Sequence, residues 1–355
     1  MSSHSTPQSG SALTPKINLP FVDEFEEPLH GYNQTVDDMA TSTDNLLICT
    51  ACGTQFDVDN PLLLTRCRIC DDPRQFVPPT GQAFTTLADL KKREYKNKWK
   101  SFDGDERFWS IWTEPKFAIG QRAVLIRTGK ENVLWDCISF LDAETIEWIN
   151  GLGGLAAIVI SHPHYYTTHL EWAQTFSCPV YLSWEDKQWL NRLDPLGASR
   201  TFIHSPTEEI EVRGQTTGVL ALKLGGHFPG SLVCLAHNRL LIADTLVTIP
   251  AGLGDWSKGP GERKVSGERP EAMNSFSFMW SIPNMIPLSP DEIMRMWDVL
   301  KGYDFESTHG AFVGTEVRDG GGGSEKRVKE RVLDSMQIQV RYMGHGDHVF
   351  LKEKI

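Results

Sequence analysis

The 355-residue sequence lacks the features that would place a protein in a membrane or outside the cell. No apolar run reaches the roughly eighteen residues that a membrane-spanning helix needs. Residues 1–20 are rich in Ser, Thr and Pro and contain no apolar segment of the secretory-signal kind. We therefore expect a soluble, cytoplasmic protein with no membrane partner. In that reducing compartment the seven cysteines indicate metal ligands or free thiols rather than disulfides.

Basic charge is also scarce, because the formal net charge is −11 at pH 7. Nucleic-acid binding normally requires a basic face, so this balance disfavours a polyanionic partner. One basic stretch, residues 91–100, predicts the solvated face of a helix, with a local basic patch as the alternative. The hydrophobic content of 40% and charged content of 23% are those of an ordinary globular protein.

The sequence divides into four parts. Residues 1–45 lack hydrophobic periodicity, which predicts a disordered or loosely docked tail. Residues 46–82 hold four of the cysteines, and residues 83–118 are interpreted as a connector that packs its aromatic side chains against the next domain. In the main domain, residues 119–355, strand-like runs alternate with helical segments, which favours a layered α/β architecture.

The cysteine module has the spacing of a four-thiolate zinc site. Cys49 and Cys52 form one C-x2-C pair, and Cys67 and Cys70 form the second. We expect a closed structural zinc site that supplies the folding free energy which so small a core lacks. Unrelated free cysteines or a redox pair are the alternative. A zinc ribbon of this kind also offers a surface for a protein partner.

Four histidines and one aspartate form the second pattern, each at a strand end or in a loop. His162 and His164 follow a buried apolar strand, and His227 lies in a glycine-rich loop. Asp244 ends the strand 240–244, and His309 lies near the end of the domain. Imidazoles with a carboxylate suit a zinc ion that keeps an open position. Taken singly, each histidine would be interpreted as a surface or packing residue.

In this order and with these flanks, the residues resemble the metallo-β-lactamase superfamily over about residues 119–315. The resemblance implies an α/β fold, a four-layer αβ/βα sandwich with the metal between the sheet edges, here preceded by a small zinc ribbon. The ribbon, the His-Pro-His-Tyr-Tyr motif and residues 281–288 are also similar to a little-characterised branch of this superfamily. That branch implies no substrate. Residues 281–288 are interpreted either as plain core or as the wall of an apolar pocket.

The first motif departs from the family pattern. Tyr166 stands where the family has its Asp, and Thr167 where it has its second-metal His. This implies a single catalytic zinc held by His162, His164, His227 and Asp244. A second catalytic zinc would require His169 or His309 as a replacement ligand, or His309 would instead donate a hydrogen bond near the reaction centre.

The implied function is a metal-dependent hydrolase for a small molecule. A zinc-bound hydroxide would attack an ester, thioester, lactone or similar carbonyl. Asp244 would orient the water or accept its proton, and Tyr165 or Tyr166 would donate a hydrogen bond to the oxyanion. Packing around the site is the alternative role of both tyrosines. The alternative functions are a mononuclear non-haem iron oxygenase that uses His162, His227 and Asp244, or a non-catalytic binding protein with a degenerate site.

Overall fold

The computed structural model describes residues 43–355 apart from 196, 198, 257–268 and 271. Residues 1–42 of the predicted tail therefore lie outside the described residues. Thr43–Ile355 forms one unit with an uninterrupted network of contacts. Among the described helices, none is both long and apolar enough to cross a lipid bilayer.

The first half of the unit is built on a mixed seven-stranded sheet, in the order β3-β4-β5-β6-β7-β8-β9. The first four strands are antiparallel and the last three continue in parallel from β6. β5 and β6 form a hairpin, in which Arg127 on β5 pairs with Asn132 on β6. The strand bounds are β3 Lys96–Phe102, β4 Asp105–Glu114, β5 Ala123–Arg127, β6 Asn132–Trp135, β7 Ala157–Val159, β8 Val180–Ser183 and β9 Arg200–Ile203.

The second half is built on a six-stranded sheet, in the order β10-β11-β12-β13-β18-β19. Its strands are antiparallel except for β13 and β18, which run in parallel. The strand bounds are β10 Thr207–Val212, β11 Gln215–Lys223, β12 Leu232–Ala236, β13 Arg239–Ala243, β18 Ser307–Gly310 and β19 Glu316–Arg318.

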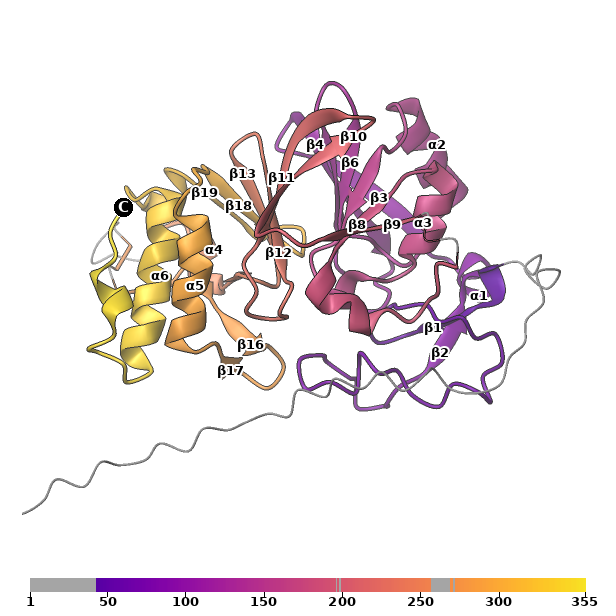
Figure 1. Ribbon diagram of the computed structural model, residues 1–355, viewed down its shortest axis with the longest axis horizontal. Coiled ribbons are helices and arrows are strands. Elements are labelled where there is room, and N and C mark those ends of the chain that lie inside the picture. The colour runs from indigo at the N-terminus through magenta and orange to yellow at the C-terminus, as the bar shows by residue number, and fades with distance from the viewer. Residues whose placement is uncertain (1–42, 196, 198, 257–268, 271) are drawn as a thin grey trace, which may run out of the picture. The chain divides into compact units, whose positions relative to one another are not determined.

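Helices cover the outer faces of both sheets and produce four layers (Figure 1). Alternation along β13 shows how the six-stranded sheet serves two cores: Leu241 faces the core shared with the seven-stranded sheet, whereas Leu240 and Ile242 face the core under α5 and α6. This is the predicted sandwich. The helix bounds are α1 Leu87–Lys91, α2 Ala143–Gly151, α3 His169–Phe176, α4 Pro250–Leu253, α5 Pro290–Leu300 and α6 Val328–Tyr342.

The remaining pairs of strands are short. β1 pairs with β2 beside the cysteines, β14 with β15, and β16 with β17 in the hairpin that residues 281–288 help to form. Their bounds are β1 Leu47–Cys49, β2 Phe84–Thr86, β14 Val247–Thr248, β15 Phe276–Ser277, β16 Met279–Ser281 and β17 Ile286–Pro287. Short 3₁₀ helices span Thr43–Asn45, Pro163–Tyr165, Trp184–Trp189, Gly321–Gly323 and Val349–Lys352.

The expected helix in the basic stretch is wrong, and so is the expected connector. α1 ends at Lys91, and the residues that follow form β3, which pairs with β4 at the edge of the seven-stranded sheet. The lysines of β3 alternate with inward residues such as Trp99, which stacks on Trp148 of α2 with the ring centroids 4.7 Å apart. Period-two alternation of this kind suits a strand and not a helix.

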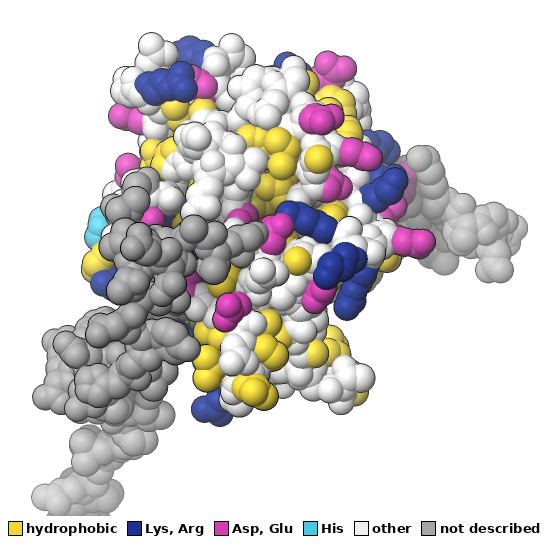
Figure 2. All heavy atoms as spheres, turned by 90° about the vertical axis from the view of Figure 1, so that its right-hand side faces the viewer, with side chains coloured by type: hydrophobic (Ala, Val, Ile, Leu, Met, Phe, Trp, Pro, Cys, Tyr) yellow, Lys and Arg dark blue, Asp and Glu magenta, His cyan; other side chains and the backbone are white. Residues whose placement is uncertain are grey.

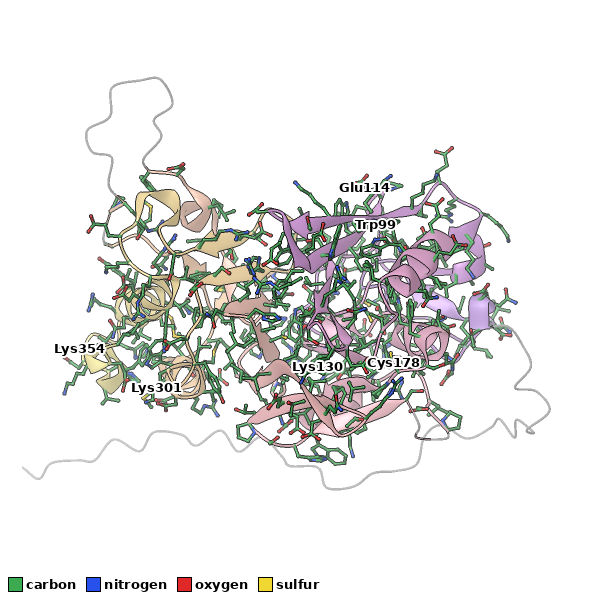
Figure 3. All side chains as sticks on the ribbon, turned by 90° about the horizontal axis from the view of Figure 1, so that it is seen from above. Trp99, Glu114, Lys130, Cys178, Lys301 and Lys354 are labelled. Atoms are coloured by element: carbon green, nitrogen blue, oxygen red, sulfur yellow. The ribbon has the colours of Figure 1, made fainter. Side chains whose placement is uncertain are left out.

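Charged side chains of both signs are mixed on one face of the molecule. Figure 2 shows the face that carries the cysteine module, where Lys and Arg side chains are interspersed with Asp and Glu side chains. In the view from above, Trp99 and Glu114 on β3 and β4 lie at the opposite end from Lys301 and Lys354 beside the C-terminal helices (Figure 3). No single sign of charge dominates the face shown in Figure 2.

Candidate metal centres

The chain delivers two histidines to the end of a buried parallel strand. β7 leads through Ser161 to His162, which has an extended backbone and precedes the 3₁₀ turn Pro163–Tyr165. The fixed φ of Pro163 favours an immediate turn after the strand, and His164 lies inside that turn. Both imidazoles are buried, at 1% and 2% exposure. The Ser161 hydroxyl lies 2.9 Å from His162 Nδ1, which leaves Nε2 to face the site.

His227 lies in the glycine-rich loop between β11 and β12. Gly225 and Gly226 have φ of +70° and +84°, and a Cβ at Gly226 would lie 2.8 Å from Leu288 Cδ1. The loop therefore requires glycine there for both conformation and space. His227 Nδ1 donates to the Trp280 carbonyl at 2.9 Å, since a carbonyl only accepts. That bond selects the tautomer with a bare Nε2, which is the form that ligates a metal.

Asp244 follows β13 and is the fourth candidate ligand, beside the three histidines. Its Oδ1 accepts a hydrogen bond from Tyr165 Oη at 2.8 Å. Its Oδ2 lies 3.5 Å from His162 Nε2 and 4.0 Å from His164 Nδ1. His227 Nε2 in turn lies 3.2 Å from His164 Nδ1. The four ligand atoms all lie within 4.8 Å of one another.

This donor set fits a metal ion. In a tetrahedron with zinc–nitrogen bonds of about 2.0–2.1 Å, neighbouring ligand atoms are about 3.3 Å apart, close to the separations observed here. His162 Nε2 is buried and has no hydrogen-bond partner among the described residues, which is costly unless a ligand uses its lone pair. The residues His162, His164, His227 and Asp244 could therefore hold one cation.

The electrostatics favour the ligating protonation states. Burial lowers the pKa of His164 to about 4 and lowers that of His227 well below its ordinary value, with the neighbouring imidazoles adding to the effect. Burial would raise the pKa of Asp244, but the adjacent imidazoles of His162 and His164 hold it well below its usual range. His164 and His227 are thus neutral and Asp244 is ionised, which are the protonation states that metal ligation requires.

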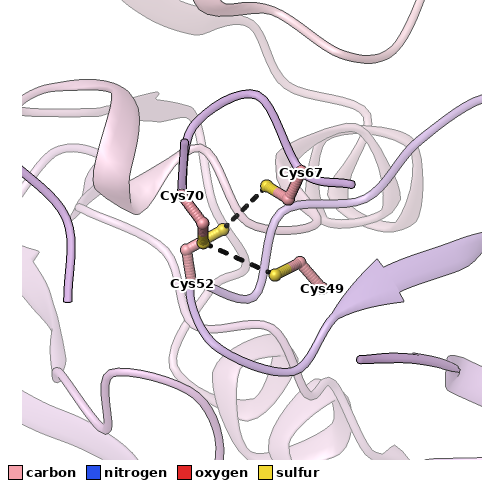
Figure 4. Close-up of side chains that lie close together, drawn as sticks. All are labelled: Cys49, Cys52, Cys67 and Cys70. Carbon is pink, nitrogen blue, oxygen red and sulfur yellow. Dashed lines mark hydrogen bonds between the residues drawn. The ribbon is translucent and has the colours of Figure 1, made fainter. Parts of the chain in front are cut away.

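The four module cysteines converge in the same way (Figure 4). The Sγ atoms of Cys49 and Cys70 are 3.6 Å apart, and those of Cys52 and Cys67 are 3.7 Å apart. A tetrahedron with zinc–sulfur bonds of about 2.3 Å has edges of about 3.8 Å. All four thiols are buried, so the module has the closed form of a structural site.

Three other predicted site residues lie elsewhere, and this corrects the expectation for each. His309 stacks on Phe102 with ring centroids 4.4 Å apart and its Nε2 contacts the Ser307 hydroxyl. His169 has both ring nitrogens engaged, with the Tyr166 carbonyl and with Arg200 Nε. Tyr166 Oη donates to the Asp186 carbonyl at 3.1 Å and so cannot serve an oxyanion at the histidine group. Among the described residues, no further group of histidine, cysteine or acidic ligands lies beside the first.

Comparison with known proteins identifies the family. The family model of the metallo-β-lactamase superfamily matches residues 118–311, more than half of the chain. The chain belongs to the metallo-β-lactamase superfamily. The match spans all four residues of the histidine–aspartate group and begins next to β5.

The chain is also similar to individual proteins. The chain is 36% identical over 310 residues to the uncharacterized protein YmaE of Bacillus subtilis, covering 83% of this chain and 95% of that protein. It is 24% identical over 154 residues to a probable metallo-hydrolase of Methanocaldococcus jannaschii, covering 41% and 71%. The solved structure of VMB-1 aligns with a TM-score of 0.44 and 15% identity, covering 70% of this chain and 99% of that chain.

The cysteine module packs against the superfamily domain next to the histidine–aspartate group. Arg74 forms an ion pair with Asp72 at 2.7 Å, donates to the His227 carbonyl at 3.2 Å and lies over the Phe228 ring at 3.9 Å. The Pro73 carbonyl accepts from the side chains of Ser281 and Asn284, both at 2.6 Å. No sequence pattern marked Arg74, because His227 and Phe228 are more than 150 residues away and only folding brings them to it.

A cavity of about 700 Å³ opens onto the metal group. His164 and Asp244 lie in its wall, so the candidate ligands are reachable by a small molecule. One side is formed by module residues 50–51 and 74–78, another by residues 116–119, and a third by Ile282 and Pro283. The prediction that residues 281–288 wall a pocket is therefore met by these two residues, and the module supplies a wall that was not predicted.

Proposed function

We propose that the protein is a mononuclear zinc hydrolase that cleaves an ester, thioester, lactone or similar carbonyl bond of a small molecule. Membership of the superfamily and the histidine–aspartate group support a metal-dependent hydrolase at the general level. The single observation that carries the finer proposal is the convergence of three imidazoles and one carboxylate at the wall of a cavity of small-molecule size.

The chain's own residues prepare the site for hydrolysis. When bound, zinc acts as a Lewis acid that activates water at neutral pH and stabilises negative charge on a carbonyl oxygen. Tyr165 holds Asp244 through Oδ1, which leaves Oδ2 turned toward the histidines. Burial raises the pKa of Tyr165, so the phenol stays neutral and continues to donate. The bond from His227 to the Trp280 carbonyl fixes that imidazole in one orientation.

Two observations favour this proposal over its alternatives. His164 Nδ1 lies among the donor atoms, 3.2 Å from His227 Nε2, whereas a two-histidine iron site would leave His164 without a role. The cavity reaches His164 and Asp244, which favours catalysis over a degenerate binding site. With His169 and His309 engaged elsewhere, a single catalytic metal is the simpler proposal.

The test is metal content per chain for protein purified without added metal, in the wild type and in His162→Ala/His227→Ala, together with hydrolysis of a panel of esters, thioesters and lactones. We expect about two zinc ions in the wild type, about one in the variant, and hydrolysis by the wild type alone. One iron with one zinc would favour an oxygenase. A metal count that the substitutions leave unchanged would remove the chemical basis of the proposal.

A further inference from the structure

The cavity beside the metal group carries charge opposite to that of the chain. Its described lining contains Arg74, Arg93 and Lys116 but only one carboxylate, Asp244, although the whole chain has a formal charge of −11. A cleft lined by one sign of charge concentrates ligands of the other sign. From this contrast we infer that the substrate carries an anionic group, which Arg93 and Lys116 bind while the scissile bond faces the metal ligands.

The three cations differ in how far they are already neutralised. Arg74 is committed to Asp72 and to the His227 carbonyl, and its side chain is only 10% exposed. Among the described residues, Arg93 and Lys116 form no ion pair, and both are exposed residues of the cavity lining. These two side chains are therefore the ones available to an incoming anion, whereas Arg74 is already bound to Asp72 and to the His227 carbonyl.

Each of the two cations is presented by a defined local structure. Arg93 follows the short helix α1, and its N–H donates to the Leu90 carbonyl at 3.0 Å. The stem of Lys116 lies across Gly120, where a Cβ would be 2.5 Å from Lys116 Cγ. Gly120 has φ of +73° and closes a turn by donating to the Phe117 carbonyl. The absence of a side chain at Gly120 thus makes room for Lys116.

The remaining lining residues indicate the chemical character of the rest of the substrate. Apart from the cations and the metal ligands, the cavity is lined largely by apolar and aromatic side chains, which are Ala51, Phe76, Pro78, Tyr95, Phe117, Ala118, Ile119, Val247, Ile282, Pro283 and Phe312. A volume of about 700 Å³ suits a small molecule rather than a polymer. The inference rests on the proposed function and narrows it to a hydrolysable compound with an apolar body and a carboxylate or phosphate.

Ligand binding measured by titration calorimetry tests the inference without needing turnover. The probes are 4-phenylbutyrate, its neutral amide and 3-phenylpropyl phosphate, which share an apolar body. The protein is the full chain as wild type, as Arg93→Gln/Lys116→Gln, and as the control Lys98→Gln/Lys100→Gln. The control removes the same charge from exposed positions on β3 that do not line the cavity.

We expect the wild type and the control to bind one of the anions roughly tenfold more tightly than the amide, and the cavity variant to lose that preference. The stronger anion distinguishes a carboxylate from a phosphate. His162→Ala/His227→Ala should keep the preference, as should His162→Ala alone if the double variant is unfolded.

Three results would overturn the inference: no preference in the wild type, a preference that survives in the cavity variant, or a preference that disappears with the metal ligands, because the anion would then bind the metal. Failure of the proposed function is distinguishable, since it would show as absent hydrolysis and an unchanged metal count while the anion preference persists.

Discussion

At the residue scale, two adjacent tyrosines have separate tasks. Tyr165 Oη donates to Asp244, whereas Tyr166 Oη donates to the Asp186 carbonyl on the far side of the turn. Both side chains are buried, and burial raises the pKa of both, so both phenols stay neutral. Consecutive residues in a 3₁₀ turn point in different directions, which is why one tyrosine reaches the metal group and the other does not.

Tyr165→Phe should weaken metal binding by about 10–100-fold, because it removes the hydrogen bond that orients Asp244. Tyr166→Phe is the matched control, since it deletes the same hydroxyl from a residue that holds no ligand, and it should leave the affinity unchanged. Competition with a chromogenic chelator measures both. Equal weakening in the two variants would mean that the loss comes from general disturbance of the turn.

The buried carboxyl group of Asp186 should make the folding stability depend on pH. Burial raises the pKa of Asp186 from 3.8 to about 7, against the hydrogen bond that Gly230 N–H donates to it. Between these values the folded state keeps a proton that the unfolded state has lost, so stability falls as the pH rises from about 4 to 7. Asp186→Asn should match the wild type near pH 4 and be more stable at pH 8 by about 2–4 kcal/mol. Urea unfolding at both pH values measures this, and an identical pH dependence in the two proteins would contradict it.

At the element scale, the loop 72–78 of the cysteine module joins structures that are distant in sequence. Arg74 reaches the His227 loop, and Pro73 accepts hydrogen bonds from the β16–β17 hairpin. On the other side of the module, Gln55 N–H donates to the Thr167 carbonyl and Gly53 accepts from Ser139. The module therefore contacts both halves of the sandwich beside the metal group.

Arg74→Gln should destabilise this loop by about 1–3 kcal/mol, because it leaves Asp72 without its buried partner. We expect faster hydrogen exchange in residues 72–78 and about a tenfold lower kcat/KM. Arg66→Gln is the control within the module, since its ion pair with Asp71 is exposed and contributes little. If Arg66→Gln lowered kcat/KM as much, the specific role of Arg74 would be refuted.

At the scale of the whole molecule, the cysteine module and the histidine–aspartate group each form part of the wall of one cavity. The four cysteines do not line the cavity, but residues 50–51, between Cys49 and Cys52, and residues of the segment 74–78, after Cys70, form part of its wall. A bound metal in such a module supplies about 10–16 kcal/mol of folding free energy, so its loss should release that wall. The cysteine group and the histidine–aspartate group, which differ in their ligand atoms, are thus both needed for an intact pocket.

Cys67→Ser should therefore lower the metal content by one ion and abolish most of the hydrolysis, while the histidine group keeps its metal. Hydrogen exchange should rise across residues 46–86 and stay slow in the central strands β7 and β12. Cys178→Ser is the control, because this buried thiol beside β8 belongs to neither metal group (Figure 3). Full activity in Cys67→Ser would show that the module is dispensable for the pocket.

The sequence by itself determined the features that are local. Helix α5 is one example, since Ser289 caps it and Pro290 fits its first turn. The two C-x2-C pairs and the histidines at strand ends indicated both groups of donors, because knuckles and strand ends position ligands through a few neighbouring residues. In β3, the alternation of lysines with inward residues was visible in the sequence, but its charge suggested a helix.

Only the tertiary structure decided what depends on distant packing. The register of β13 with β18 pairs His309 with Leu241, and the ring of His309 stacks on Phe102 instead of joining the ligands. Arg200, in β9, donates a hydrogen bond to His169 Nε2, so that this nitrogen cannot ligate a metal. The cavity exists because the module, the hairpin and the segment before β5 meet over Asp244, and their positions result from many long-range contacts. Which residues can bind a metal is therefore a local property, whereas what reaches that metal is a property of the whole fold.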